Sequence, residues 1–408
     1  MWDRLKRLFS GSAKSPRRSA AQFNTRRGNQ SDERVLPYWS QRTPLADSAE
    51  ARFSYLGNGV SHEAADLATD AELLKKLELP VVETGNQLAE AIGFSPKRLK
   101  RLAVHSAQTR SCNYFYFTVP KRSGGERLLA APRPQIDACC RWILREILDK
   151  ISIHPAAHGF AKGKSIKSNA EIHTQQQVIV NLDLLDFFPA IEFRRVRGLF
   201  ESLGYNGQIA TLLALLTTEA SREPVPSPAG TLWAATGPRH LPQGACSSPS
   251  ISNLICRALD RRLSGLCRSL SWNYSRYADD LTFSASAVAG QRVGYMLHRI
   301  RGIVREEGFQ VNESKTRVQR PSQAQTVTGL VVNDGVSVSR STVRMLRAIL
   351  HNASLHGLES QNRDNHPHFA AWLEGMIGHV VNVDPQHGVK LQRQFRQLKK
   401  QQVSHNHE

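Results

Sequence analysis

Residues 276–283 read Arg-Tyr-Ala-Asp-Asp-Leu-Thr-Phe, and this stretch decides the fold that we expect for the chain. Apolar residues alternate with small or polar ones on both sides of the two carboxylates, which predicts a strand, a tight turn and a second strand. Two adjacent carboxylates at the tip of a hairpin repel each other unless cations bind there. Asp279 and Asp280 therefore indicate either a divalent-metal site for phosphoryl transfer or a solvated acidic turn.

A second acidic position favours the metal site. Residues 178–183 read Val-Ile-Val-Asn-Leu-Asp, an apolar strand that ends in a carboxylate beside a loop, where metal ligands are commonly found. In two-metal phosphoryl transfer, one ion lowers the pKa of the attacking hydroxyl and the other stabilises the leaving pyrophosphate. The two ions lie about 4 Å apart, a spacing that carboxylates from adjacent strands can bridge. We expect Asp183 and Asp279 to bridge two Mg²⁺ ions and Asp280 to assist.

The composition favours a nucleic-acid partner. The chain of 408 residues carries 54 Lys and Arg against 35 Asp and Glu, a net charge of +19, which points to nucleic acid before an anionic membrane. Its six cysteines lack the spacing of a zinc site, so we interpret them as reduced thiols of a cytoplasmic protein. No apolar run is long enough to span a bilayer.

Basic segments stand near both ends of the chain. Residues 1–45 are poor in apolar residues and rich in Arg, Ser and Gln, which predicts a disordered arm that contacts RNA or keeps the protein in solution. Apolar residues at helical spacing near the C-terminus predict several helices. One of these bears Arg340, Arg344 and Arg347, and such basic faces are compatible with a clamp on a duplex.

Two further segments predict local structure. Residues 61–105 read as three helices, the second of which begins with a capping box at Thr84. Residues 114–129 predict a β-hairpin, in which Lys121 and Arg127 flank a glycine-rich turn and could hold phosphate oxygens.

Two other segments are less regular. Residues 158–166 are rich in glycine and lysine but lack the spacing of a P-loop, although they could still contact phosphate. Residues 220–240 contain several prolines and predict an irregular loop.

Five motifs together resemble those of a known enzyme family. Asp-x-x-Asp-Phe-Phe at 183–188, Leu-Pro-Gln-Gly at 241–244 and Tyr-Ala-Asp-Asp at 277–280 stand in the order found in reverse transcriptases. Asn-Ala-x-x-His at 169–173 and Val-Thr-Gly at 327–329 are similar to two signatures of bacterial retron reverse transcriptases.

The resemblance covers roughly residues 79–400 and implies an α+β fold, the right-hand polymerase fold. Its parts would be fingers and a palm, the latter an antiparallel sheet with helices, followed by a helical thumb and preceded by a basic disordered arm. The implied divisions are an arm at 1–60, an N-terminal helical segment at 61–105, fingers and palm at 106–335, and a thumb at 336–408.

The resemblance also implies an activity. Such an enzyme is an RNA-directed DNA polymerase that takes deoxynucleoside triphosphates and copies part of its own structured non-coding RNA into single-stranded DNA. It often primes from a guanosine 2′-hydroxyl, which leaves a branched RNA–DNA product. Retron systems commonly serve in phage defence together with an effector protein.

Individual site residues follow from the same resemblance. Phe188 matches the bulky residue that excludes a ribose 2′-hydroxyl. The other residues expected near the incoming nucleotide or the template are Lys121, Arg127, Gln243, Gly244 and Lys315. The residues expected to bind RNA are Asn169, His173, Val327, Thr328, Gly329, Arg344 and Arg347.

Two alternatives remain open from the sequence. A catalytically silent RNA-binding scaffold could keep the polymerase shape, but it would have no need to keep Asp183, Asp279 and Asp280. A group II intron-like or other bacterial reverse transcriptase would share the polymerase motifs. However, no His-Asn-His-like nuclease segment follows residue 335, and the two retron signatures favour a retron enzyme. Cys246 departs from the family pattern, since many relatives have proline there.

Overall fold

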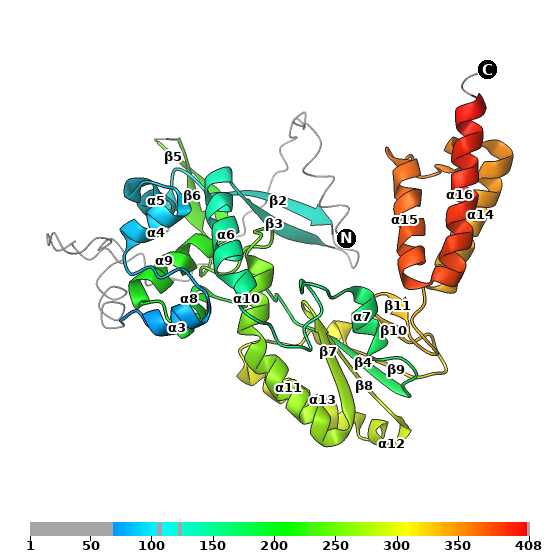
Figure 1. Cartoon of the computed structure of the whole chain (residues 1–408), viewed down its shortest axis with the longest axis horizontal. Helices are drawn as coiled ribbons and strands as arrows, with labels where there is room; N and C mark the ends of the chain where they lie inside the picture. Colours follow the sequence, from blue (N-terminus) through cyan, green and yellow to red (C-terminus); the bar gives the residue numbers. More distant parts are fainter. Residues whose placement is uncertain (1–67, 104–107, 121–124, 229, 406–408) are drawn as a thin grey trace, which may run out of the picture. The chain divides into compact units, whose positions relative to one another are not determined.

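Figure 1 shows a computed structural model of the chain. The structure describes residues 68–103, 108–120, 125–228 and 230–405. The basic arm predicted for residues 1–60 therefore lies outside the described residues. Within the described ranges, no helix is both long enough and apolar enough to cross a membrane.

A four-stranded antiparallel sheet, here called the central sheet, contains the two strands that carry Asp183 and Asp280 at their ends. Its order is β7 (Trp272–Tyr277), β8 (Asp280–Ala285), β4 (Val178–Asp183) and β9 (Arg317–Gln319). β7 and β8 form the predicted hairpin. The register between β4 and β8 pairs Asp183 with Asp280. The last residue of β4 therefore lies beside the first residue of β8, although the two strands are distant in the sequence.

The two faces of the central sheet belong to different cores, because successive side chains of a strand point to opposite faces. Val178, Val180 and Leu182 of β4 belong to the larger hydrophobic core, whereas Ile179 belongs to the smaller one. Asp183 is four residues after Ile179 and therefore points to the same face, that of the smaller core. In β8, Leu281 and Phe283 face the larger core, so Asp280 points to the same face as Asp183.

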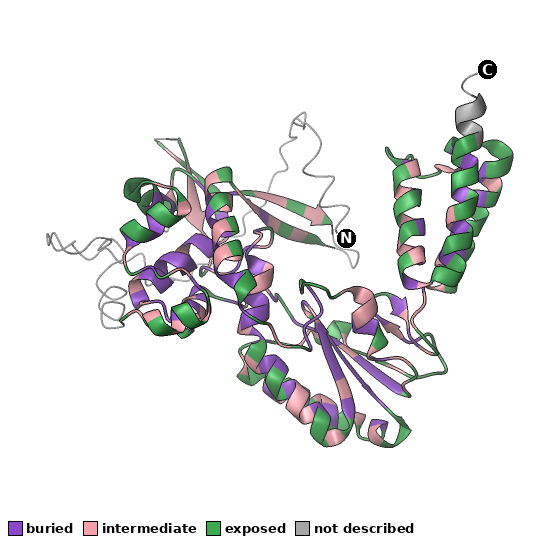
Figure 2. Cartoon of the chain, in the orientation of Figure 1, coloured by how far each residue is buried: buried purple, intermediate pink, exposed green. Residues whose placement is uncertain are grey.

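Helices cover both faces. α11 (Arg257–Leu270) and α13 (Val293–Glu306) pack on the face of the larger core (Figure 1). The smaller core joins α7 (Ile166–Glu171) with the C-terminal helices α14 (Arg340–His356), α15 (Phe369–Val383) and α16 (Pro385–His405). Figure 2 shows β4, β7 and β8 largely buried and the outer faces of the helices exposed, and the edge strand β9 is mostly exposed.

The described N-terminal elements follow the sequence prediction, while residues 61–67 and 104–105 of the predicted helical segment lie outside the described residues. Three helices precede a β-hairpin, and α4 (Gly85–Ile92) begins with the predicted capping box at Thr84 and ends at Gly93, whose φ is +84°.

The other elements are α3 (Ala71–Lys76), α5 (Pro96–Ala103), β1 (Gln108–Thr109), β2 (Tyr114–Pro120), β3 (Glu126–Pro132), α6 (Pro134–Glu146), η3 (Leu148–Lys150), α8 (Phe193–Ser202), α9 (Gly207–Thr217), β5 (Arg222–Ser227), β6 (Gly230–Ala235), α10 (Ser248–Ile255), α12 (Ala287–Gly290), η4 (Glu313–Lys315), β10 (Thr326–Val327), β11 (Leu330–Val331) and η5 (Glu359–Gln361).

The prediction of an irregular loop at residues 220–240 is wrong. β5 and β6 form a hairpin there, and β6 also pairs with β1. The prolines that suggested a loop, Pro224 and Pro226, lie in β5, an edge strand of this three-stranded sheet. Proline lacks an amide hydrogen and is tolerated at an edge, where one side of the strand needs no partner.

A buried ion pair anchors the β7–β8 hairpin to the helices. Arg276 donates to both oxygens of Asp260 in α11, at 2.8 and 2.7 Å, and both side chains have 0% exposure. A third nitrogen of Arg276 donates to Asn253 at 3.0 Å and to the carbonyl of Ala278 in the turn at 3.1 Å. The hydroxyl of Tyr274 completes the network with a bond to Asp260 at 2.8 Å. A buried pair is tolerable when its remaining polar atoms are satisfied in this way.

We expect Arg276→Met to lower the free energy of unfolding by about 3–5 kcal/mol, because it leaves Asp260 buried without its partner. Arg301→Met is the matched control, since it breaks an ion pair with Glu313 that is exposed to water and contributes little. Urea-induced unfolding of the two variants measures the difference. Equal, small losses in both would show that the buried pair does not stabilise the hairpin.

Candidate active site

Three carboxylates meet at one end of the central sheet. Asp183 ends β4 and pairs with Asp280, which begins β8. Asp279 lies in the β7–β8 turn, where its carbonyl accepts a hydrogen bond from the Leu184 amide at 3.0 Å. Ala278 gives the turn its shape, with a φ of 58° that non-glycine residues seldom adopt. The structure thus brings the three acidic residues together, as expected, while their role in metal binding stays a prediction.

Burial and neighbouring charges change the acidity of Asp279 and Asp280. Burial raises the pKa of Asp279, and repulsion by Asp183 raises it further, while Lys315 and Arg127 lower it. Burial together with the charges of Asp279 and Asp183 raises the pKa of Asp280 to about 7. Because the Asp280 side chain still reaches solvent, we regard its like-charged neighbours as the main cause. A cation bound among the carboxylates would relieve this repulsion.

Lys315 supplies a counter-charge to the cluster. Its Nζ lies 3.1 and 3.0 Å from the two carboxylate oxygens of Asp183, and Asn312 Nδ2 donates to the same carboxylate at 3.3 Å. Among the described residues, no group of three or more His, Cys, Asp or Glu side chains is already arranged to hold a metal ion. The donor set still suits magnesium, which prefers carboxylate oxygens. A bound cation would compete with Lys315 for the oxygens of Asp183.

Comparison with known families identifies the family of the chain. Residues 119–346 match the family described as reverse transcriptase (RNA-dependent DNA polymerase). The chain belongs to the reverse transcriptase family. This membership supports the predicted right-hand polymerase fold in its general form, whereas the assignment of fingers, palm and thumb to particular residues stays a prediction.

Individual relatives narrow the class. The retron Mx65 reverse transcriptase of Myxococcus xanthus is 40% identical over 89% of this chain and 84% of that protein. The retron Mx162 reverse transcriptase of the same organism is 38% identical over 84% of this chain and 74% of that protein. The retron Ec86 reverse transcriptase of Escherichia coli is 35% identical over 68% and 81%, respectively. The protein is therefore a retron-type reverse transcriptase, and the prediction of an RNA-directed DNA polymerase is confirmed.

The residues expected near the nucleotide differ in their surroundings. Arg127 of β3 lies close enough for its charge to lower the pKa of Asp279. Phe188 is half-buried, with its ring 5.3 Å from that of Phe187 and 6.4 Å from that of Phe160. Lys121 lies outside the described residues. The nucleotide-binding roles of these side chains stay predictions.

The loop that contains Gln243 and Gly244 packs on the β2–β3 hairpin. The carbonyl of Gln243 accepts a hydrogen bond from the Ala130 amide at 2.8 Å. Gly244 has a φ of +138°, and a Cβ at this position would lie 2.6 Å from the carbonyl oxygen of Ala130. Glycine is therefore required here by the close approach of two backbones, whether or not the loop also contacts a nucleotide or template.

The glycine-rich segment 158–166 has a role that the sequence did not reveal. The His158 amide donates to the Arg276 carbonyl at 2.7 Å, which joins the segment to β7. Asn253 Nδ2 donates to the Gly159 carbonyl at 2.9 Å. A Cβ on Gly159 would lie 2.4 Å from the Ala278 nitrogen, so the segment packs directly against the acidic turn. No local pattern signals this contact, because its two sides are distant in the sequence.

Three of the residues expected to bind RNA are in the interior. Asn169, His173 and Val327 each have 0% exposure. In this arrangement their side chains contact protein, and a direct contact with RNA would require the surrounding core to open. We therefore revise the expected direct contact: these residues shape the structure around the central sheet. Asparagine is mostly exposed in proteins and histidine is intermediate, so the first signature gives no sign of an interior position.

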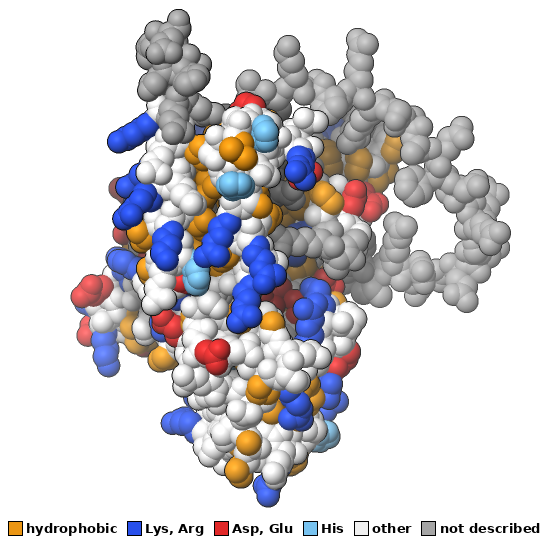
Figure 3. Space-filling view, turned by 90° about the vertical axis from the view of Figure 1, so that its right-hand side faces the viewer, with side chains coloured by type: hydrophobic (Ala, Val, Ile, Leu, Met, Phe, Trp, Pro, Cys, Tyr) orange, Lys and Arg blue, Asp and Glu red, His pale blue; other side chains and the backbone are white. Residues whose placement is uncertain are grey.

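The remaining RNA-binding candidates reach the surface. Thr328 and Gly329 form the β10–β11 turn with φ values of 48° and 85°, and the Thr328 hydroxyl donates to the Ile166 carbonyl at 3.3 Å. Arg344 and Arg347 are exposed on α14. Figure 3 shows Lys and Arg side chains gathered on the face that turns toward the viewer. These positions are accessible to RNA, and their role stays a prediction.

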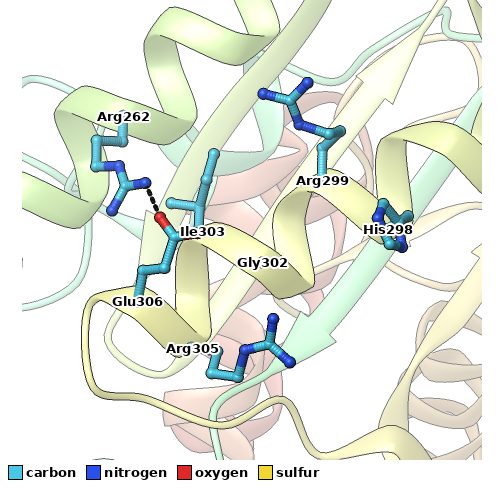
Figure 4. Close-up of a pocket in the computed structure, with 7 residues that line it drawn as sticks. All are labelled: Arg262, His298, Arg299, Gly302, Ile303, Arg305 and Glu306. Carbon is cyan, nitrogen blue, oxygen red and sulfur yellow. Dashed lines mark hydrogen bonds and ion pairs between the residues drawn. The ribbon is translucent and has the colours of Figure 1, made fainter.

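A shallow pocket of about 320 Å³ lies away from the carboxylates. It forms where α11 and α13 meet, and the Arg262 side chain pairs with Glu306 at its edge (Figure 4). Its lining residues are Arg262, His298, Arg299, Gly302, Ile303, Arg305 and Glu306. Because these helices cover the opposite face of the central sheet from Asp183, the pocket is separate from the candidate active site.

We expect Gly159→Ala to reduce RNA-templated primer extension by about a hundredfold, since displacement of the acidic turn by about 1 Å is enough for such a loss. Gly198→Ala in α8 is the matched control, because its added Cβ would meet no atom within 4 Å. Primer extension by the folded fraction of each variant provides the comparison. Wild-type activity in Gly159→Ala would show that the turn tolerates displacement.

Proposed function

We propose that this protein is the polymerase of a retron and copies part of a cognate structured non-coding RNA into single-stranded DNA by two-metal nucleotidyl transfer. The observation that carries the proposal is the meeting of Asp183, Asp279 and Asp280 at one end of the central sheet. The similarity to three retron reverse transcriptases supports the assignment to a retron.

In this mechanism Asp183, Asp279 and Asp280 would hold two Mg²⁺ ions, with Asp183 and Asp279 as the main ligands and Asp280 assisting. The ions would lower the pKa of the primer hydroxyl and stabilise the charge on the leaving pyrophosphate. The pKa of Asp280 is raised, and Asp183 already contacts the cation of Lys315. Both observations support a cluster whose carboxylates a divalent cation would stabilise. Lys315, released from Asp183 by an ion, would be free to contact the phosphates.

The nucleotide would be held between the acidic cluster and the β2–β3 hairpin. Arg127, together with Lys121, would bind the triphosphate, since guanidinium and ammonium groups donate charge-assisted hydrogen bonds to phosphate oxygens. Phe188 would exclude a ribose 2′-hydroxyl by its bulk. The Gln243–Gly244 loop would contact the template and the nucleotide base pair.

The retron assignment has further consequences. The template would be an RNA that the C-terminal helices grip as a thumb, with Arg344 and Arg347 on its phosphates. Priming from a 2′-hydroxyl would give a branched RNA–DNA product. We place the reaction in the cytoplasm, in a system that acts against phages through an effector protein. Sequencing of the nucleic acid that co-purifies with the protein distinguishes this assignment from a group II intron-like enzyme, which would yield no 2′,5′-branched hybrid.

We expect Asp279→Asn to abolish DNA synthesis and to leave RNA binding largely intact, because it removes a metal ligand without changing the shape of the turn. Asp364→Asn, at an exposed carboxylate in the C-terminal helical part, is the control and should retain full activity. Primer extension with magnesium and a parallel RNA-binding assay measure the two properties. Loss of both properties together would contradict the assigned role of Asp279.

A second substitution tests sugar selection. Phe188→Ala should admit ribonucleoside triphosphates, since it removes the ring that is expected to fill the space beside C2′. Phe115→Ala, which removes an exposed ring from β2, should leave the preference for deoxynucleotides unchanged. The ratio of kcat/KM for dNTP and rNTP incorporation reports the selection. An unaltered ratio in Phe188→Ala would show that another group excludes the ribose.

A further inference from the structure

A buried histidine joins the two strands of the acidic hairpin. His173 follows α7 and is wholly enclosed. Its Nδ1 lies 2.7 Å from Ser284 Oγ of β8, and its Nε2 lies 2.8 Å from Ser275 Oγ of β7. Both serines are also buried. One imidazole therefore bridges adjacent strands with both of its ring nitrogens.

The bridge lies on the face of the sheet that carries the acidic cluster. In β8, Ser284 follows the same alternation as Asp280, on the face opposite the larger core. Ser275 pairs across the ladder with Thr282, halfway between Ser284 and Asp280. The short stretch of hairpin between this bridge and the turn is the part that positions the carboxylates.

The chemistry of the bridge requires a neutral ring. Burial lowers the pKa of His173 to about 3, with a smaller contribution from His158. A neutral imidazole has one N–H donor and one acceptor nitrogen, and a hydroxyl group can complement either. Asn273 Nδ2 donates to Ser284 Oγ at 3.3 Å. In one tautomer the Ser284 hydroxyl donates to Nδ1 and Nε2–H donates to Ser275 Oγ, and in the other both directions reverse. Both ring nitrogens are then satisfied within the protein.

The element that holds His173 is itself fixed from the other side. Ala170 belongs to the core that the C-terminal helices build. Lys167 Nζ donates to the Asn382 carbonyl of α15 at 3.2 Å, and the Ile166 carbonyl accepts from Thr328. α7 thus connects the C-terminal helices to the acidic hairpin, and His173 is its point of attachment to the strands.

We infer that His173 is a positioning residue for catalysis, which fixes β7 against β8 and so holds Asp279 and Asp280 in register with Asp183. This inference rests on the proposed role of those carboxylates. We expect the loss of the bridge to loosen the packing of β7 against β8 near the turn. Groups that hold metal ligands in their orientation contribute about 10- to 100-fold to metal affinity or activity.

The test compares His173→Phe, His173→Gln and Ser284→Ala with wild type in single-nucleotide incorporation on an RNA template. We expect His173→Phe to lower kcat by about tenfold or more and to raise the Mg²⁺ concentration for half-maximal rate, with KM for the template unchanged. His173→Gln, whose amide can donate and accept, should recover part of the loss. Ser284→Ala removes a single oxygen atom, so it keeps the test valid if His173→Phe folds poorly.

A control separates positioning from general stability. Phe200 is a fully buried side chain of α8, and Phe200→Leu should lower Tm without changing kcat or the Mg²⁺ requirement. A His173→Phe protein that binds template weakly but turns over at the wild-type kcat would overturn the inference in favour of an RNA-binding role. Activity that falls only with the folded fraction, as in the control, would also overturn it. An inactive wild type would instead reject the proposed function.

Discussion

Repulsion between three carboxylates is the constraint on which the rest of the structure depends. Asp183, Asp279 and Asp280 come from two segments that are far apart in the sequence, and the β4–β8 register forces them to one end of the sheet. Burial and like-charged neighbours raise the pKa of Asp279 and of Asp280, and the repulsion favours separation of the carboxylates. The fold has to resist this separation, and Lys315 offsets only part of it through its contact with Asp183.

Support for the acidic turn comes from both faces of the sheet. On the face of the larger core, Arg276 connects the turn to α11 through a buried ion pair. On the acidic face, His173 bridges β7 and β8 from α7. Gly159 packs directly against the backbone of Ala278 in the turn, which is possible because glycine has no side chain. Arg276, His173 and Gly159 thus hold the turn and its two strands through contacts with different elements. The position of the turn is therefore determined by tertiary contacts rather than by its own sequence.

The sequence predicted the features that depend on local pattern. Alternation around Asp279 predicts the β7–β8 hairpin, and the capping box at Thr84 predicts the start of α4, because each pattern acts within one element. The hairpin at 222–235 was missed, since proline disfavours strands in general and the tolerance of an edge position becomes visible only in the sheet. The interior position of His173 was likewise hidden, because its partners Ser275 and Ser284 lie about a hundred residues away.

The central claim is that the three carboxylates form one site for divalent cations, and binding of Mn²⁺ tests it without any requirement for template or turnover. Mn²⁺ prefers the same oxygen ligands as magnesium and is detected directly by electron paramagnetic resonance. The account predicts that the wild-type protein binds Mn²⁺ and that Asp183→Asn binds it far more weakly. Equal Mn²⁺ binding by the two proteins would contradict it.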